Sequence, residues 1–148
     1  MEISSKRYLA AIVASVVCGV ASSIVVAEGN MPPEQTQGAV RYLSGGIGTD
    51  EQDAMKQAAS SYPLEVQFLA RGTSEGMPRR LYTASVGVTI RDSSGNTVLQ
   101  TTASGPFMLA TLPDGDYTIV ADTNGQRETR RFRVAQGKHQ TLVFEWNS

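Results

Sequence analysis

The arginines of one predicted strand are the residues of this chain whose types and spacing best suit ligand chemistry. Arg127, Arg131 and Arg133 share one face of residues 126–134, and Arg130 lies on the other, because side chains alternate along a strand. Arginine forks match planar anions, so the three form a candidate patch for an anion or partner, such as an acidic glycan or a lipid headgroup. The alternative interpretation, which the sequence alone favours, is an edge strand whose charge prevents aggregation.

His139 is the single histidine and the first candidate for acid–base catalysis. No second histidine accompanies it, and the only cysteine, Cys18, lies in the N-terminal segment described below. The neighbouring Gly137 and Lys138 indicate a solvated turn. The sequence therefore predicts no catalytic set, and we expect the chain not to be an enzyme.

Two acidic groups and one glycine-rich turn have the residue types of ion sites but not their spacing. Residues 50–53 (DEQD) read as a helix start, and residues 114–116 (DGD) read as a turn. Neither has the distal glutamate of a calcium loop. Residues 45–48 (GGIG) precede a predicted helix but lack the Gly-Lys-Ser/Thr ending of a phosphate loop. We therefore expect no metal and no cofactor.

Composition limits the function classes further. The 148 residues include 13 Lys+Arg and 14 Asp+Glu, a net charge of −1. A protein built to bind nucleic acid usually carries a strong basic excess, so nucleic acid is not an expected partner. A single cysteine excludes an internal disulfide.

The N-terminal segment has the layout of a secretory signal peptide. Lys6 and Arg7 precede an uncharged run, residues 8–27, which ends in Val-Val-Ala before Glu28. Cleavage after Ala27 predicts a periplasmic or secreted protein, with membrane contact only during export. The run of 20 residues is also long enough to remain as an N-terminal membrane anchor if the signal stays uncleaved. Cys18 is interpreted as one more apolar residue of this run, not as a lipidation site.

The next two segments are predicted to be a linker and a small helical part. Residues 28–37 are polar and contain two prolines, as expected for a linker. Residues 38–62 predict a short strand, a glycine turn and one amphipathic helix that Pro63 ends. Residues 49–52 (TDEQ) fit a capping box. The expected apolar face of the helix consists of Met55, Ala58, Ala59 and Tyr62.

From Pro63 on, the hydrophobic period changes from 3.6 to 2, which indicates strands. Turn residues separate the runs, and residues 72–80 are expected to be a loop. Residues 63–148 thus predict a mainly β domain, an antiparallel seven-stranded sandwich of Ig-like or prealbumin-like type. The expected strands cover residues 64–71, 86–91, 97–103, 107–112, 117–121, 126–134 and 139–146.

One motif in this region carries a family resemblance. Residues 105–121 (GPFMLATLPDGDYTIVA) contain Pro113 and Gly115 in a tight turn, followed by Tyr117, whose hydroxyl is placed to bond the backbone. With the hairpin of residues 86–96, this block resembles the carboxypeptidase regulatory-like family over about residues 84–146. Residues 45–82 are more loosely similar to small exported proteobacterial proteins that carry this domain alone. The resemblance implies a prealbumin-like, carbohydrate-binding-like fold that is usually not catalytic.

These observations favour an exported, non-catalytic β-sandwich module that binds a protein or glycan partner in the cell envelope. One alternative is a structural or adhesive subunit that links copies by strand addition. Another is a transthyretin-like hydrolase with a site around His139, although the chain lacks that group's Tyr-Arg-Gly-Ser-like ending. Trp146 is expected to belong to the core and not to a sugar-stacking platform.

Overall fold

The structure, a computed structural model, describes residues 30–147. The predicted signal peptide, its cleavage site after Ala27 and Cys18 lie outside these residues. Between residues 30 and 147, no helix has the length and apolar character needed to cross a bilayer.

Residues 30–147 form ten strands, one α-helix and one turn of 3₁₀-helix. The helix α1 spans Thr49–Ala58, and the 3₁₀ turn η1 (Ala59–Ser61) follows it directly. The strands are β1 (Gln35–Gln37), β2 (Val40–Gly45), β3 (Leu64–Ser74), β4 (Met77–Tyr82), β5 (Val86–Asp92), β6 (Thr97–Ala103), β7 (Phe107–Thr111), β8 (Gly115–Thr123), β9 (Gln126–Val134) and β10 (Gln140–Asn147).

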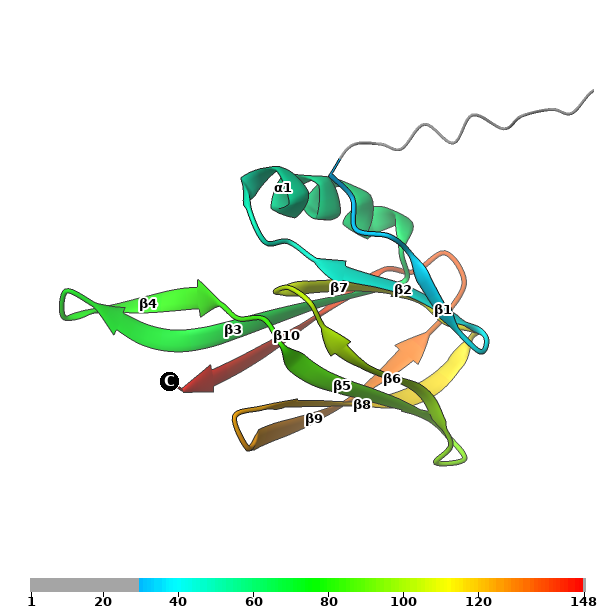
Figure 1. Ribbon diagram of the computed structural model, residues 1–148. Coiled ribbons are helices and arrows are strands. Elements are labelled where there is room, and N and C mark those ends of the chain that lie inside the picture. The colour runs from blue at the N-terminus through cyan, green and yellow to red at the C-terminus, as the bar shows by residue number, and fades with distance from the viewer. Residues whose placement is uncertain (1–29, 148) are drawn as a thin grey trace, which may run out of the picture.

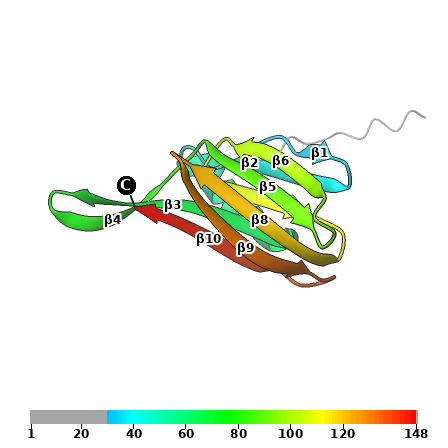
Figure 2. The same ribbon diagram turned by 90° about the horizontal axis from the view of Figure 1, so that it is seen from below.

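The strands build two facing sheets, so the chain is mainly β, as predicted (Figures 1 and 2). The six-stranded sheet has the order β1-β2-β7-β3-β10, with β4 paired to the outer half of β3. The four-stranded sheet has the order β6-β5-β8-β9. β2 lies inside the six-stranded sheet, between β1 and β7, so residues 38–62 are part of the same body as the rest.

The core lies between the two sheets and is built by alternating side chains. β3 contributes Leu64, Val66 and Phe68, and β5 contributes Val88 and Ile90, all essentially inaccessible to solvent. At one end of the core, the rings of Phe68, Phe144 and Trp146 stack with centroids 6.0–6.3 Å apart. Trp146 is therefore a core residue, as expected, and not an exposed platform.

The helix α1 covers the outer surface of the six-stranded sheet above β2 and β7 (Figure 1). Met55 and Ala59 are buried there against Leu43, Phe107 and Leu109. The remaining residues of the predicted apolar face, Ala58 and Tyr62, are partly buried against the same group. The predicted apolar face of the helix is confirmed.

The predicted capping box at the start of α1 is wrong. Gly48 occupies the N-cap position, and no side chain caps the helix. Thr49 is consequently already the first helical residue, so its hydroxyl cannot act as the cap. Instead, the Glu51 carboxylate accepts a hydrogen bond from the backbone N–H of Gly46, with 2.6 Å between the heavy atoms. The carboxylate ties the glycine turn to the first turn of the helix.

The expectation of seven strands after Pro63 is also wrong, because the described residues from 63 on form eight, β3 to β10. β2 corresponds to the short strand expected before the helix, and β1 lies within the predicted linker. β4 falls where a loop was predicted: β3 and β4 form a hairpin around Glu75 and Gly76, both at positive φ. This hairpin projects past the sandwich as an arm (Figures 1 and 2).

One strand pair is parallel, so the predicted all-antiparallel arrangement is wrong there. β10 runs parallel to β3, from Gln140 opposite Leu64 to Asn147 opposite Arg71. Parallel pairing needs a long crossover, and here the whole of the four-stranded sheet lies between the two strands in the sequence. Sequence periodicity does not encode strand direction, which explains the error.

β9 and β10, the edge strands of the two sheets, lie beside each other along one side of the sandwich (Figure 2). The Gln140 side-chain amide donates to the carbonyl oxygen of Arg133, and that of Gln126 donates to the carbonyl oxygen of Asn147. Arg130 lies over the Phe144 ring, 5.4 Å from its centroid. Its side chain thus points inward from β9 and away from the other three arginines of that strand.

Candidate functional site

The surface of the four-stranded sheet that faces away from the core is the candidate site, called here the outer face. Alternation defines it: on β5 and β8 the residues between the outward ones, such as Val88 and Ile119, are buried. Its side chains are mostly hydroxyl-bearing or charged. They are Thr89 and Arg91 from β5, Thr97, Gln100 and Thr102 from β6, Asp116, Thr118, Val120 and Asp122 from β8, and Arg127, Thr129, Arg131 and Arg133 from β9.

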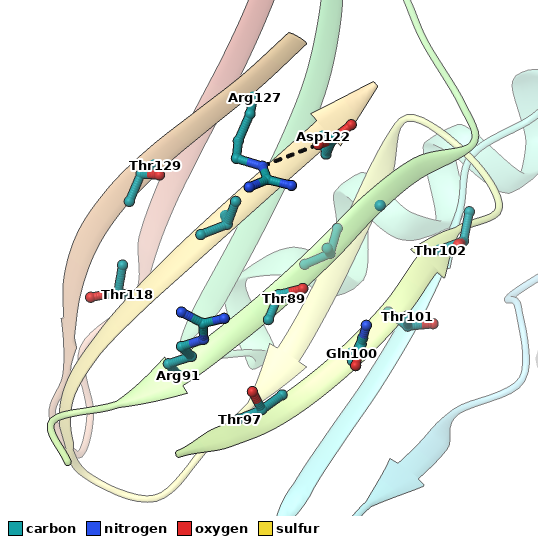
Figure 3. A pocket seen from close by; sticks show the side chains of 13 residues that line it. Thr89, Arg91, Thr97, Gln100, Thr101, Thr102, Thr118, Asp122, Arg127 and Thr129 are labelled. Carbon is teal, nitrogen blue, oxygen red and sulfur yellow. Dashed lines mark hydrogen bonds and ion pairs between the residues drawn. The ribbon is translucent and has the colours of Figure 1, made fainter. Parts of the chain in front are cut away.

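The outer face is hollowed, and the hollow is the largest among those described (Figure 3). This first hollow has a volume of about 830 Å³ and is open to solvent, and all four strands of the sheet line it. Figure 3 shows threonine hydroxyls from every one of these strands around its floor. No aromatic residue lines it in the described chain. A ligand here would be held by hydrogen bonds and charge, without ring stacking.

The three arginines predicted from the sequence all lie on the outer face, but they are not equivalent. Arg127 forms an ion pair with Asp122, with 3.1 Å between Nε and the carboxylate oxygen (Figure 3). Arg133 donates two hydrogen bonds, of 2.7 and 3.2 Å, to the carboxylate of Asp116. The hydrogen bond from Arg133 lowers the pKa of the Asp116 carboxyl below its ordinary value. Arg131 has no ion pair or hydrogen-bond partner for its side chain among residues 30–147.

Arg91 is a residue of this surface that the sequence analysis missed. It lies on β5 opposite Thr118 of β8, and Thr118 in turn lies opposite Arg131 of β9. The guanidinium of Arg91, like that of Arg131, has no carboxylate partner within the described part of the chain. The signal that could have found it is the outward alternation of Gly87, Thr89 and Arg91, but the pairing of β5 with β8 was needed to bring it beside β9.

A second hollow of about 700 Å³ adjoins the first and shares Arg91 and Thr118 with it. Arg131 and Asp116 line it from the other side. Arg91 and Thr118 thus line both hollows, and all three residues of the Arg91–Thr118–Arg131 row line the second.

Pro113, Gly115 and Tyr117, the predicted fold motif, form the turn into β8. The Tyr117 hydroxyl donates a hydrogen bond of 2.6 Å to the carbonyl oxygen of Pro113, and its ring stacks on Phe132. Burial raises the pKa of Tyr117 above its ordinary value, and the negative charges of Asp92 and Asp114 raise it further. These contacts stabilise the end of β8 that presents Asp116 and Thr118.

His139 lies away from the outer face, in a polar cluster at the start of β10. Its Nδ1 is 2.7 Å from the carbonyl oxygen of Tyr62, which can only accept, so Nδ1 carries the proton. Its Nε2 lies 3.3 Å from the Thr141 hydroxyl and 3.5 Å from the carboxylate of Glu65. Glu65 is only 8 % exposed and also accepts hydrogen bonds from Gln67 and Thr141. The imidazole of His139 is thus held in a fixed orientation, and the carboxylate of Glu65 contacts three side chains, those of Gln67, Thr141 and His139.

Two of the acidic side chains considered from the sequence have other partners in the described residues. Between residues 30 and 147, no three His, Cys, Asp or Glu side chains converge as ligands of a metal ion would. Of the acidic groups considered from the sequence, Glu51 bonds the Gly46 amide and Asp116 bonds Arg133.

No family model matches this chain, and comparison with curated proteins finds no relative. The resemblance to the carboxypeptidase regulatory-like family therefore remains a prediction from residues 105–121 and 86–96.

Proposed function

We propose that this chain is an exported, non-catalytic β-sandwich module that binds a glycan of the cell envelope through its outer face. The observation that carries the proposal is the hollow of about 830 Å³ over that face, lined by hydroxyl, amide, carboxylate and guanidinium groups from four strands. Sugars are hydrogen-bonded through many hydroxyl groups, and such a lining offers donors and acceptors at close spacing. The outer face could instead bind a partner protein, and a pull-down from envelope extract tests this form of the proposal.

Family and location belong to the same proposal. Support for a prealbumin-like domain of the carboxypeptidase regulatory-like family comes from the Pro113–Tyr117 hydrogen bond within a two-sheet architecture. Support for export comes from the sequence of residues 1–27. Cleavage of this segment would release the protein into the periplasm or the medium, and an uncleaved segment would keep it at the membrane as an anchor.

The direct experiment is a binding screen of the full chain against neutral and acidic oligosaccharides, with the double variant Thr89→Val and Thr129→Val as the test of the site. Both threonines line the first hollow, and valine replaces the hydroxyl, a donor and acceptor, by a methyl group of similar size. We expect binding to weaken by about tenfold when two hydrogen bonds are lost. Unchanged binding, or turnover of any bound oligosaccharide, would contradict the proposal.

A second candidate is an adhesive subunit that links copies of this chain by strand addition. The arm formed by β3 and β4 favours it, because Met77 and Leu81 are 56 % and 50 % exposed there and β4 pairs on one side only among residues 30–147. Light scattering after size exclusion tests it: association that Met77→Ser with Leu81→Ser abolishes would support linkage through the arm. A monomer at every concentration would exclude it.

A hydrolase with a site around His139 is the third candidate. The 3.3 Å between His139 Nε2 and the Thr141 hydroxyl is the observation in its favour. Activity toward any envelope substrate that survives the His139→Ala substitution would exclude this site.

A further inference from the structure

We infer that Arg91, Thr118 and Arg131 form a subsite for an anionic group, a carboxylate or sulfate carried by an acidic sugar. The inference rests on the proposed function and narrows its ligand from glycans in general to acidic glycans. It starts from the charges of the outer face, whose outward residues include four arginines, at positions 91, 127, 131 and 133, and two aspartates, at positions 116 and 122, a net charge of +2. Asp92, at the end of β5, also lines the second hollow, where its carboxylate accepts hydrogen bonds from the backbone amides of Ser94 and Asn96.

This local excess of positive charge contrasts with the chain as a whole, whose net charge is −1. The two aspartates neutralise Arg127 and Arg133 through direct ion pairs. The excess is therefore concentrated on Arg91 and Arg131, which have no carboxylate partner within residues 30–147. Figure 3 shows the contrast for two of them: the guanidinium of Arg127 is joined to Asp122, whereas that of Arg91 is joined to no residue drawn.

Strand pairing brings the two unpaired arginines to opposite sides of one residue. Arg91 lies opposite Thr118 across β5 and β8, and Thr118 lies opposite Arg131 across β8 and β9. Two strand spacings separate the Cα atoms of the arginines by about 10 Å. Arginine side chains are long enough to converge over Thr118 from both sides, and its hydroxyl lies on the floor between them.

The chemistry of this row suits an anion better than any other ligand group. Each guanidinium presents a planar fork of N–H donors that binds a carboxylate or sulfate with two hydrogen bonds. Two unpaired cations on the strands that flank β8 also repel each other, so an anion between them relieves repulsion as it binds. The first hollow, which shares Arg91 and Thr118 with the second, leaves room for the sugar rings to extend over its threonines.

The test compares variants of the full chain for affinity toward a heparin oligosaccharide at low salt. Arg91→Gln with Arg131→Gln should weaken binding about tenfold or more, because charge-assisted hydrogen bonds are lost. Arg41→Gln with Arg79→Gln removes the same charge from the six-stranded sheet and the arm, and should change affinity by less than about twofold.

The outcomes separate this inference from the function on which it rests. If the Thr89 and Thr129 variant loses binding while Arg91→Gln with Arg131→Gln retains it, the outer face binds glycans but the anion subsite is wrong. If both control and test arginine pairs weaken binding equally, long-range charge alone attracts heparin, and the subsite is again wrong. Binding to vesicles containing phosphatidylglycerol, or to inorganic sulfate, with no binding to heparin would overturn the assignment to an acidic sugar.

Discussion

Arg91 and Arg131 lie on opposite sides of Thr118, one strand away in each direction, on the solvent-facing surface of the four-stranded sheet. They are 40 positions apart in the sequence, and only the order β5-β8-β9 brings them together. Their neighbours Arg127 and Arg133 are neutralised by aspartates, which leaves one positive row on a surface otherwise balanced in charge.

Removing the Tyr117 hydroxyl should weaken the fold without altering it. Tyr117→Phe deletes the hydrogen bond to the Pro113 carbonyl but keeps the ring that stacks on Phe132. A single intramolecular hydrogen bond contributes about 1 kcal/mol, so we expect the free energy of unfolding to fall by that amount in a urea titration. An unchanged midpoint would show that the hydrogen bond is not formed in solution.

The ion pair between Arg133 and Asp116 should make stability depend on acidic pH. Because the folded-state pKa of Asp116 is lowered, its contribution is present above the unfolded-state pKa and is lost as pH falls through the folded-state value. Arg133→Gln should therefore raise the pKa of Asp116 toward its ordinary value, measured by NMR titration of the carboxyl carbon. Stability should then fall less between neutral pH and pH 2 than in the unmodified chain. The same titration curve for both proteins would contradict the assignment.

Gly105 should tolerate no side chain, because the chain segments pack closely there. A Cβ added to Gly105 would collide with the backbone carbonyl of Gly45. We expect Gly105→Ala to cost about 3 kcal/mol of unfolding free energy, the upper end for overpacking. Gly87→Ala is the matched control: its Cβ would meet the carbonyl oxygen of Asp122 at 3.5 Å and the Cβ of Asp122 at 3.9 Å, both ordinary contacts. Equal effects of the two substitutions would refute the close approach.

Glu51 should matter more than its neighbour Asp50, although both are acidic residues in the first turn of α1. Glu51 bonds the Gly46 amide, whereas Asp50 offers only its charge to the helix dipole. We expect Glu51→Ala to reduce the free energy of unfolding by about 2 kcal/mol. Asp50→Ala should cost about 0.5 kcal/mol, measured in the same denaturant series. A larger loss for Asp50→Ala would reverse this interpretation.

The class of fold was predictable because a strand with one buried face has a period of two. Leu64, Val66 and Phe68 alternate in the sequence as they do in the core. The same reasoning failed for residues 72–80, since the arm has no buried face to impose alternation and the Glu75–Gly76 turn was read as part of a longer loop. The parallel pairing of β10 with β3 could not be predicted from the sequence, because it depends on contacts between distant segments.

The candidate site was predictable only within one strand. Alternation correctly separated Arg130 from Arg127, Arg131 and Arg133, and Arg130 does point inward over Phe144. The sequence of β9 alone predicts neither the ion pairs that neutralise Arg127 and Arg133 nor the position of Arg91 on the same surface. Both depend on which residues of β8 and β5 lie opposite, which sequence alone does not give.

The most direct test of the outer face as the ligand surface is an amide NMR titration of the ¹⁵N-labelled full chain with a heparin oligosaccharide. The account predicts shift changes concentrated on β5, β8 and β9 around Thr118, with the amides of α1 and β2 unaffected. Shift changes confined to α1, to the arm or to the cluster around His139 would contradict it, as would no change at all.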